Sequence, residues 1–191
     1  MIHCIVIGFH KWSRVEPLMR QLTSMATDQI EVHFADNLGD EEIHKQLSML
    51  PYTNYYCFDN LGYGNAVNQI LRSNHWNVDS LFIVMNDDAI FMGNGFNILA
   101  QTFKKIIVHN GNVGVVSPTF VATDSTKDSS RYFQLSNTKK ENYSEMLFGP
   151  AACWMFDYAF LKKVGGFYPG FFMYGEDTEL LNRATYYGLK H

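Results

Sequence analysis

Short apolar runs alternate with longer segments whose apolar residues recur at helical spacing through the first 117 residues. The short runs are rich in β-branched residues and end in polar loops, as buried strands do. We therefore predict strands at 2–8, 30–35, 54–58, 81–85 and 113–117. The periodic segments between them predict helices at about 14–26, 40–49, 63–74 and 95–109.

Strands that alternate with helices of this length are typical of βαβ units. The helix predicted over 14–26 illustrates the spacing, with apolar residues at Val15, Leu18, Met19, Leu22 and Met25. The sequence thus predicts an α/β fold with a mostly parallel, Rossmann-like central sheet flanked by helices.

The pattern changes after residue 117. Residues 123–144 are polar and rich in turn formers, which favours a surface hairpin or excursion. An apolar run at 149–161 and a glycine-rich turn at 164–170 follow, and a last helix is predicted at roughly 177–187. Because neither a repeat nor a linker interrupts the 191 residues, we expect one domain spanning 1–191.

Composition narrows the class of protein. The chain is 47% hydrophobic and 18% charged, as in globular domains, and its net charge of −4 comes without any basic block. A nucleic-acid groove is therefore not expected. No apolar stretch reaches the roughly 18 residues of a membrane span, and the chain begins directly with an apolar run rather than a basic leader. Cys4, Cys57 and Cys153 lie within apolar runs, which favours reduced thiols and a cytoplasmic protein.

Polar residues cluster where the predicted strands end. In open α/β sheets, ligands bind beyond the carboxyl ends of the strands, so clusters in register there predict one shared pocket. The clusters are Asp36 and Asn37 after the second strand, Asp59 and Asn60 after the third, and Asn86, Asp87 and Asp88 after the fourth.

The cluster Asn86–Asp88 follows an apolar strand, where carboxylates are costly unless a cation meets them. Mg²⁺ or Mn²⁺ takes one or two carboxylates together with phosphate oxygens and water. Asp88 could equally cap a turn or a helix, since Asp and Asn are ordinary at such positions.

Three other segments also allow two interpretations. The glycines of "NLGYGNAVN" (60–68) could expose helix amides to an anion, or only make a strand–turn–helix junction. Asp36 and Asn37 could bind a nucleobase or ribose, or only stabilise a turn. The acids of "YGEDTEL" (174–180) could supply a general base, or only complement the dipole of a helix.

In this order and context, these segments resemble the nucleotide-sugar glycosyltransferases of family 2, especially the rhamnosyltransferase-like branch. The resemblance covers about 3–190 and is most specific over "GPAACWMFDYAFLKKVGGFYPGFFMYGEDTELLNRA" (149–184). That segment is similar to the family's pattern of a glycine, an apolar strand, a helix, "VGGF", a turn, "FF-Y-ED--L" and an arginine. "NLGYGNAVN" and "FADN" (34–37) resemble two further stations of the family.

The resemblance implies a glycosyltransferase A-type fold, with a nucleotide-binding half at about 1–117 and an acceptor-facing half at about 118–191. It implies that Asp177, assisted by Glu176, acts as the base and that Asp88 holds Mn²⁺ or Mg²⁺. Nucleotide-sugar contacts fall on Phe9, Asp36, Asn37, Asn60, Gly62, Tyr63, Asn68, Asn86 and Asp87. Acceptor contacts fall on Trp154, Phe172 and Tyr174.

The chain departs from the family pattern in two places. The metal station of the family commonly reads Asp-x-Asp or Asn-Pro-Asp, whereas this chain has Asn86-Asp87-Asp88, so either of the first two residues could assist the third. Family members usually continue with a further strand and a metal-contacting histidine, a role that His191 does not match. The resemblance thus implies a chain short at its C-terminus, either a fragment or a minimal version.

The implied activity is metal-dependent, inverting transfer of a sugar from a nucleoside diphosphate sugar to a saccharide or lipid-linked acceptor. Cell-surface polysaccharide synthesis in the cytoplasm, with peripheral association at the inner face of the membrane as an option, would be its setting. The alternatives are a non-catalytic nucleotide-sugar-binding or scaffold domain and a sugar nucleotidyltransferase. The second is disfavoured because "GFHKWSR" (8–14) has a single glycine.

Overall fold

The central feature of the protein is a five-stranded sheet with the order β3-β2-β1-β4-β7. In the computed structural model, which describes residues 1–121, 133–139 and 143–191, four of these strands are parallel and β7 is antiparallel. Their bounds are β1 Ile2–Gly8, β2 Ile30–Asp36, β3 Thr53–Cys57, β4 Leu81–Asn86 and β7 Cys153–Asp157. The strand predictions for residues 2–85 are confirmed to within one residue at each end.

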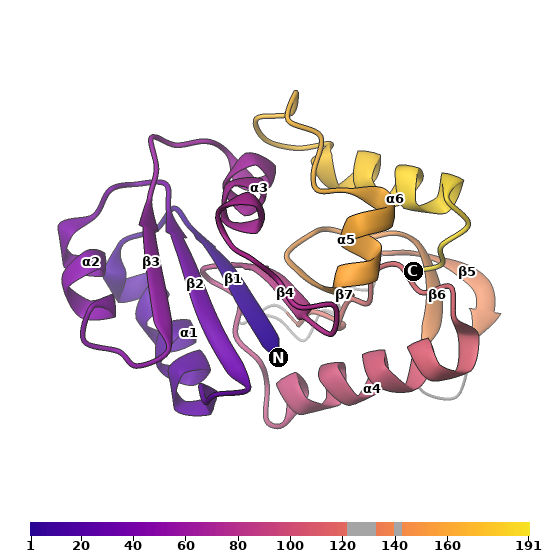
Figure 1. The fold of residues 1–191 in the computed structure, drawn as a ribbon, viewed down its shortest axis with the longest axis horizontal. Helices are drawn as coiled ribbons and strands as arrows, with labels where there is room; N and C mark the ends of the chain where they lie inside the picture. The colour runs from indigo at the N-terminus through magenta and orange to yellow at the C-terminus, as the bar shows by residue number, and fades with distance from the viewer. Residues whose placement is uncertain (122–132, 140–142) are drawn as a thin grey trace.

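Helices cover both faces of the sheet (Figure 1). Their bounds are α1 Trp12–Met25, α2 Glu41–Leu47, α3 Tyr63–Ser73, α4 Gly95–Asn110, α5 Tyr158–Val164 and α6 Glu176–Tyr186. The periodic segments therefore form the helices that their spacing predicts. Asp40 begins α2 by accepting hydrogen bonds from the backbone N–H groups of Glu42 and Ile43.

The core has two layers because successive residues of each strand point to opposite faces. On one face Ile5 and Ile7 pack with residues of α3, α5 and α6. On the other, Cys4 and Val6 pack with residues of α1, α2 and α4. The sheet is thus buried on both faces, which explains why its strands read as continuous apolar runs.

The predicted strand at 113–117 is wrong. Val113 and Val116 form only isolated bridges, to Lys190 and Met155 respectively, and β7 takes the place beside β4 instead. Gly114 lies within this segment and Pro118 directly follows it, and both residues weaken a ladder. Cys57 also differs from expectation, because its side chain is exposed whereas Cys4 and Cys153 are buried.

A hairpin is found, but it extends beyond the predicted segment 123–144: β5 Gln134–Lys139 pairs antiparallel with β6 Ser144–Phe148, which begins at the last residue of that segment. The rest of that prediction lies outside the described residues. His191 belongs to the same region, because its carbonyl accepts a hydrogen bond from Met146 N–H at 2.6 Å. None of the helices in the described ranges is long and apolar enough to cross a membrane.

Candidate functional site

The parallel strands end together, so the loops that follow β1, β2, β3 and β4 meet at one edge of the sheet. The register places Gly8 beside Asp36 and Ile7 beside Asn86, and Asp36 beside Cys57. The clusters predicted at strand ends are therefore neighbours, as expected for an open α/β sheet.

Asp87 fastens the loop after β1 to the loop after β4. Its carboxylate accepts hydrogen bonds from Phe9 N–H at 2.7 Å and His10 N–H at 2.9 Å, and from His10 Nδ1 at 2.7 Å. Because a carboxylate only accepts, Nδ1 carries the proton and Nε2 of this half-exposed ring stays available. The residue is buried, so Asp87 holds the two loops together and has little surface of its own to offer a ligand.

Asp88 is the acid of this loop that faces solvent. Its Oδ2 lies 2.8 Å from Arg14 Nη2 of α1, and about a third of its side chain is exposed. Asn86 ends β4 and is partly exposed. One accessible carboxylate suits a Mg²⁺ or Mn²⁺ ion that draws its other ligands from substrate phosphates and water. The oxygen donor set thus fits such an ion, with Asp88 rather than Asp87 as the protein ligand.

Asp36 holds the turn after β2. Its oxygens accept hydrogen bonds from the backbone N–H groups of Leu38, Gly39 and Asp40 and from the Tyr55 hydroxyl, all at 2.8–2.9 Å. The residue is fully buried. Of the two interpretations, this geometry favours turn stabilisation, and Asp36 presents no surface to a ligand in this conformation.

Asn37 joins the loop after β2 to the loop after β3. Its side chain donates to Gly62 O at 3.2 Å and accepts from Leu61 N–H at 3.3 Å, while its own N–H donates to Gly8 O. Asn60, exposed and with φ near +23°, makes the preceding turn. The start of α3 is therefore fixed relative to β1 and β2, with Asn37 itself buried and Asn60 open to a ligand.

The loop before α6 lies directly on the start of α3 (Figure 1). A Cβ on Gly62, whose φ is 76°, would collide with the carbonyl oxygen of Phe172. Asn65 donates to Pro169 O at 3.3 Å and to Phe171 O at 3.4 Å. The aromatic–acidic segment 171–180 is thereby brought to the edge where β1, β2 and β4 end.

Asn68 anchors the same loop from inside. Its amide donates to Phe167 O at 2.7 Å and accepts from Phe167 N–H at 2.9 Å, and the side chain is buried. The prediction that Asn68 contacts a nucleotide sugar is wrong in this structure, because both polar atoms of its amide bond the backbone. Arg183 holds the loop from α6 through Val164 O and Gly166 O.

Tyr63 is the first residue of α3. Its hydroxyl donates to Ala151 O at 2.6 Å, so it too is occupied. Burial raises the pKa of Tyr63, and the charges of Cys153, Glu176 and Asp177 add to the rise.

Glu176 and Asp177 have different surroundings although they are adjacent. Glu176 is buried, and its Oε2 has no hydrogen-bond partner among the described residues. Burial raises the pKa of the Glu176 carboxyl, and the charge of Asp177 adds to the rise, against a lowering by its backbone N–H. Asp177 is partly exposed, and its Oδ1 accepts from Thr178 N–H at 2.7 Å and from the Thr178 hydroxyl at 3.3 Å. Asp177 is thus the acid of this pair that an incoming hydroxyl can reach.

The predicted acceptor aromatics divide between core and surface. Trp154 is fully buried in β7 and stacks on Phe167, so the prediction that it lines an acceptor cleft is wrong. Its place within the apolar run at 149–161 could have revealed this. Phe172 and Tyr174 are exposed, by 55% and 82%, on the loop that rests on Gly62. An open groove of about 820 Å³ continues from Phe171 and Gly175 along α6.

Sequence reasoning missed His10 and Arg14, which contact Asp87 and Asp88 from the β1–α1 region. The basic and aromatic composition of "FHKWSR" (9–14), directly after a buried strand, is a signal that could have found them.

Neither a protein-family model nor a curated protein sequence matches the chain. The fold is similar to solved structures at low sequence identity. S. aureus TarS matches with a TM-score of 0.66 at 14% identity, over 96% of this chain and 54% of that one. TarS in complex with UDP-GlcNAc gives 0.63 at 14% identity, over 96% and 52%.

A mannosyltransferase of Pyrobaculum calidifontis, in complex with GDP-Man and Mn²⁺, matches with a TM-score of 0.68 at 15% identity, over 99% of this chain and 53% of that one. The chain thus spans about half the length of the structures it matches. Its mostly parallel sheet, flanked by helices and closed by an antiparallel strand, has the glycosyltransferase A-type fold.

Proposed function

We propose that the protein transfers a sugar from a nucleoside diphosphate sugar to an acceptor hydroxyl, with inversion, as family 2 enzymes do. A set of contacts between loops carries the proposal. Asp87 accepts a hydrogen bond from Phe9 N–H, which joins the loops after β4 and β1. Asn37 bonds Gly62 O, and Gly62 lies against the Phe172 carbonyl. With the hydrogen bond from Asn37 N–H to Gly8 O, these contacts link the loop that carries Asp88 to the segment that precedes Asp177, which supports a site shared by the two acids. The UDP-GlcNAc and GDP-Man in the similar structures support a nucleotide-sugar donor.

The donor is assigned to the nucleotide-binding half, about 1–117. Phe9, Asn60 and the partly exposed Asn86 contact it directly, and the amide groups at the start of α3 face its diphosphate. Asp36, Asn37, Tyr63 and Asp87 position these groups without touching the donor. Asn68 acts one step further away, by holding the loop on which the acceptor segment rests.

A Mn²⁺ or Mg²⁺ ion on Asp88, when bound with the donor, supplies Lewis-acid neutralisation of the diphosphate charge. The Mn²⁺ of the similar mannosyltransferase supports this choice of ion. Arg14, whose guanidinium already lies beside Asp88, adds a second positive charge at the same place. His10 presents Nε2 at the same loop as a hydrogen-bonding group.

Asp177 is the proposed base. The acceptor oxygen forms a bond to the anomeric carbon, the bond from that carbon to the phosphate oxygen breaks, and the acceptor proton passes to Asp177. The nucleoside diphosphate leaves with the electron pair. Glu176 assists by its position beside Asp177, where burial raises the pKa of its own carboxyl.

The acceptor is assigned to the half at about 118–191, where Phe172 and Tyr174 offer exposed rings to the apolar face of a sugar. We assign the reaction to glycoconjugate or polysaccharide synthesis at the cytoplasmic side of a membrane. The acceptor is a saccharide or a lipid-linked saccharide.

A second candidate is a domain that binds the donor without transferring its sugar. One observation favours it: Asp177 Oδ1 is turned back onto Thr178. Donor binding would be intact under this alternative, whereas turnover would be absent.

One experiment separates the two candidates. Binding of a panel of nucleoside diphosphates and their sugars is measured with and without Mn²⁺, and turnover is then measured for the wild type and Asp177→Asn. If the protein transfers the sugar, the wild type and Asp177→Asn should both bind the donor, and turnover should be about 10²–10⁴-fold lower in Asp177→Asn. Binding without turnover in either protein contradicts transfer and supports the second candidate, and absence of binding contradicts both.

A further inference from the structure

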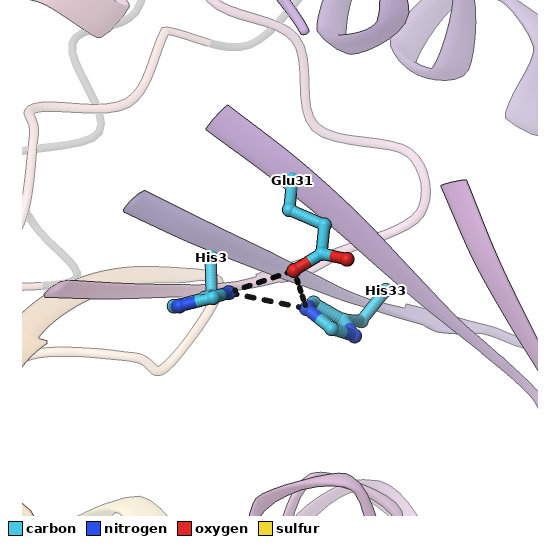
Figure 2. A group of neighbouring side chains, drawn as sticks. All are labelled: His3, Glu31 and His33. Atoms are coloured by element: carbon cyan, nitrogen blue, oxygen red, sulfur yellow. Dashed lines mark hydrogen bonds and ion pairs between the residues drawn. The ribbon is translucent and has the colours of Figure 1, made fainter. Parts of the chain in front are cut away.

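A second group of potential metal ligands lies at the opposite end of the sheet from Asp88. His3 on β1 pairs in register with Glu31 on β2, and His33 follows two residues later on the same face (Figure 2). His3 lies five residues before Gly8, about 16 Å along the strand at roughly 3.3 Å per residue. The group is therefore separate from the proposed donor site.

The three facing atoms form an almost regular triangle. His3 Nδ1 lies 3.3 Å from His33 Nε2 and 3.3 Å from Glu31 Oε2, and the last two atoms are 3.4 Å apart. In a tetrahedral zinc site with bonds of about 2.0–2.1 Å, neighbouring donor atoms lie about 3.3–3.4 Å apart. The triangle thus has the size of one face of such a tetrahedron.

Each of the three side chains is also held from behind. His33 Nδ1 lies 3.2 Å from the Tyr56 hydroxyl, His3 Nε2 lies 3.4 Å from Ser80 Oγ, and Asn54 donates to Glu31 Oε1 at 2.7 Å. Outer contacts of this kind fix the tautomer and orientation of metal ligands. Here they leave one nitrogen or oxygen of each residue directed at the common centre.

The two histidines are buried, whereas the side of the group formed by Glu31 is open to solvent. The facing ring nitrogens of the histidines are thus held out of bulk solvent. Trp76 contacts both rings edge-on and covers them. Glu31 is about one third exposed, so solvent reaches the carboxylate side of the group.

We infer that His3, Glu31 and His33 form a Zn²⁺ site with water as the fourth ligand, which ties β1 to β2 at the amino end of the sheet. Two imidazoles and one carboxylate suit Zn²⁺ and neighbouring transition metals, whereas Mg²⁺ prefers oxygen ligands. The site is new with respect to sugar transfer and does not depend on it.

The test measures metal uptake, not activity. Metal-free protein without nucleotide is dialysed against Zn²⁺, and bound metal is counted for the wild type, Glu31→Gln, His33→Gln and the matched control His109→Gln, which removes an exposed histidine. Asp88→Asn is included so that the proposed donor metal is not counted. Co²⁺ replaces Zn²⁺ in a parallel series, because its visible absorption reports tetrahedral coordination.

The expected result is one Zn²⁺ per chain, bound equally by the wild type, His109→Gln and Asp88→Asn. Loss of an outer contact to a metal ligand costs about 10–100-fold in affinity, so loss of a ligand in Glu31→Gln or His33→Gln should cost at least as much. If the buried His33→Gln fails to fold, the partly exposed Glu31→Gln carries the test. Wild-type protein without bound Zn²⁺, or Glu31→Gln with unchanged affinity, overturns the inference.

Discussion

The carbonyl oxygen of Phe172 lies where a side chain on Gly62 would begin. The two residues are more than a hundred positions apart, yet their contact joins the segment that starts α3 to the segment that carries Asp177. Gly62 also has a φ of 76°, which other residues rarely adopt. This contact decides whether the proposed donor and acceptor halves meet.

Gly62→Ala should therefore destabilise the fold and separate the two segments. With φ 76° and ψ 177°, the backbone alone costs about 1–3 kcal/mol for a residue with a side chain, and the collision with Phe172 adds to that cost. Gly93→Ala is the matched control, because Gly93 also has a positive φ, of 52°, but nothing lies within 4 Å of its added Cβ. Urea unfolding should show the larger loss for Gly62→Ala, and equal losses would contradict the packing described here.

Asn68→Ala should lower the free energy of unfolding because both polar groups of the Phe167 backbone lose their partner. Each unsatisfied buried group costs about 1–3 kcal/mol. Asn97→Ala is the control, since Asn97 is exposed and bonds only Asn94, and such surface changes stay within about 0.5 kcal/mol. If the two variants unfold at the same urea concentration, Asn68 does not hold the loop.

Glu176→Gln should change how stability depends on pH. Burial raises the pKa of Glu176 in the folded protein, so folding favours its protonated form. Its contribution to stability is full below the unfolded-state pKa and is lost as pH rises through the folded-state pKa. The amide has no such titration, so the variant should gain stability relative to the wild type as the pH rises above about 4, the ordinary pKa of a glutamate.

Unfolding curves of both proteins across that pH range provide the measurement. Glu179→Gln serves as the control, because Glu179 lies on the same helix but is paired with Arg183. A constant difference between wild type and Glu176→Gln at every pH would show that Glu176 does not titrate in this range.

Asp88→Asn should remove the dependence of donor binding on the divalent cation. Wild-type protein is expected to bind a nucleoside diphosphate at least about tenfold more tightly with Mn²⁺, equivalent to 1.4 kcal/mol. Asp59→Asn is the matched control, since Asp59 is an exposed acid at the end of β3. Calorimetric titration with the nucleoside diphosphate, with and without Mn²⁺, checks this. An unchanged effect of Mn²⁺ on binding in Asp88→Asn would show that the ion does not bind at Asp88.

The sheet could be predicted from the sequence because burial on both faces makes each central strand a continuous apolar run. The strand at 113–117 could not be excluded, since a short apolar run reads the same whether it pairs fully or at single bridges such as Val116–Met155. The antiparallel pairing of β7 with β4 could not be predicted either. It joins residues about 70 positions apart, such as Met85 and Cys153, and local sequence patterns do not encode such pairing.

The positions of the site residues could be predicted better than their contacts. Strand ends placed Asp36 and Asp87 at the correct edge, but the sequence does not say whether a carboxylate faces a ligand or backbone N–H groups. Both turn inward to backbone donors, and Asp88, one residue later, turns outward to Arg14. The pairing of His3 with Glu31 depends on strand register, which the sequence pattern alone left open.

The most direct test of the account is the distance between a bound Mn²⁺–nucleotide and the segment 175–178. Nuclear magnetic resonance spectra of the protein are recorded with UDP or GDP and either Mg²⁺ or paramagnetic Mn²⁺. If the donor and the base share one site, Mn²⁺ should broaden the amide signals of Phe9, Gly62 and Asp177 most strongly, and the broadening should be lost in Asp88→Asn. Broadening near Phe9 that leaves Gly62 and Asp177 sharp would contradict a single site shared by the donor and the base.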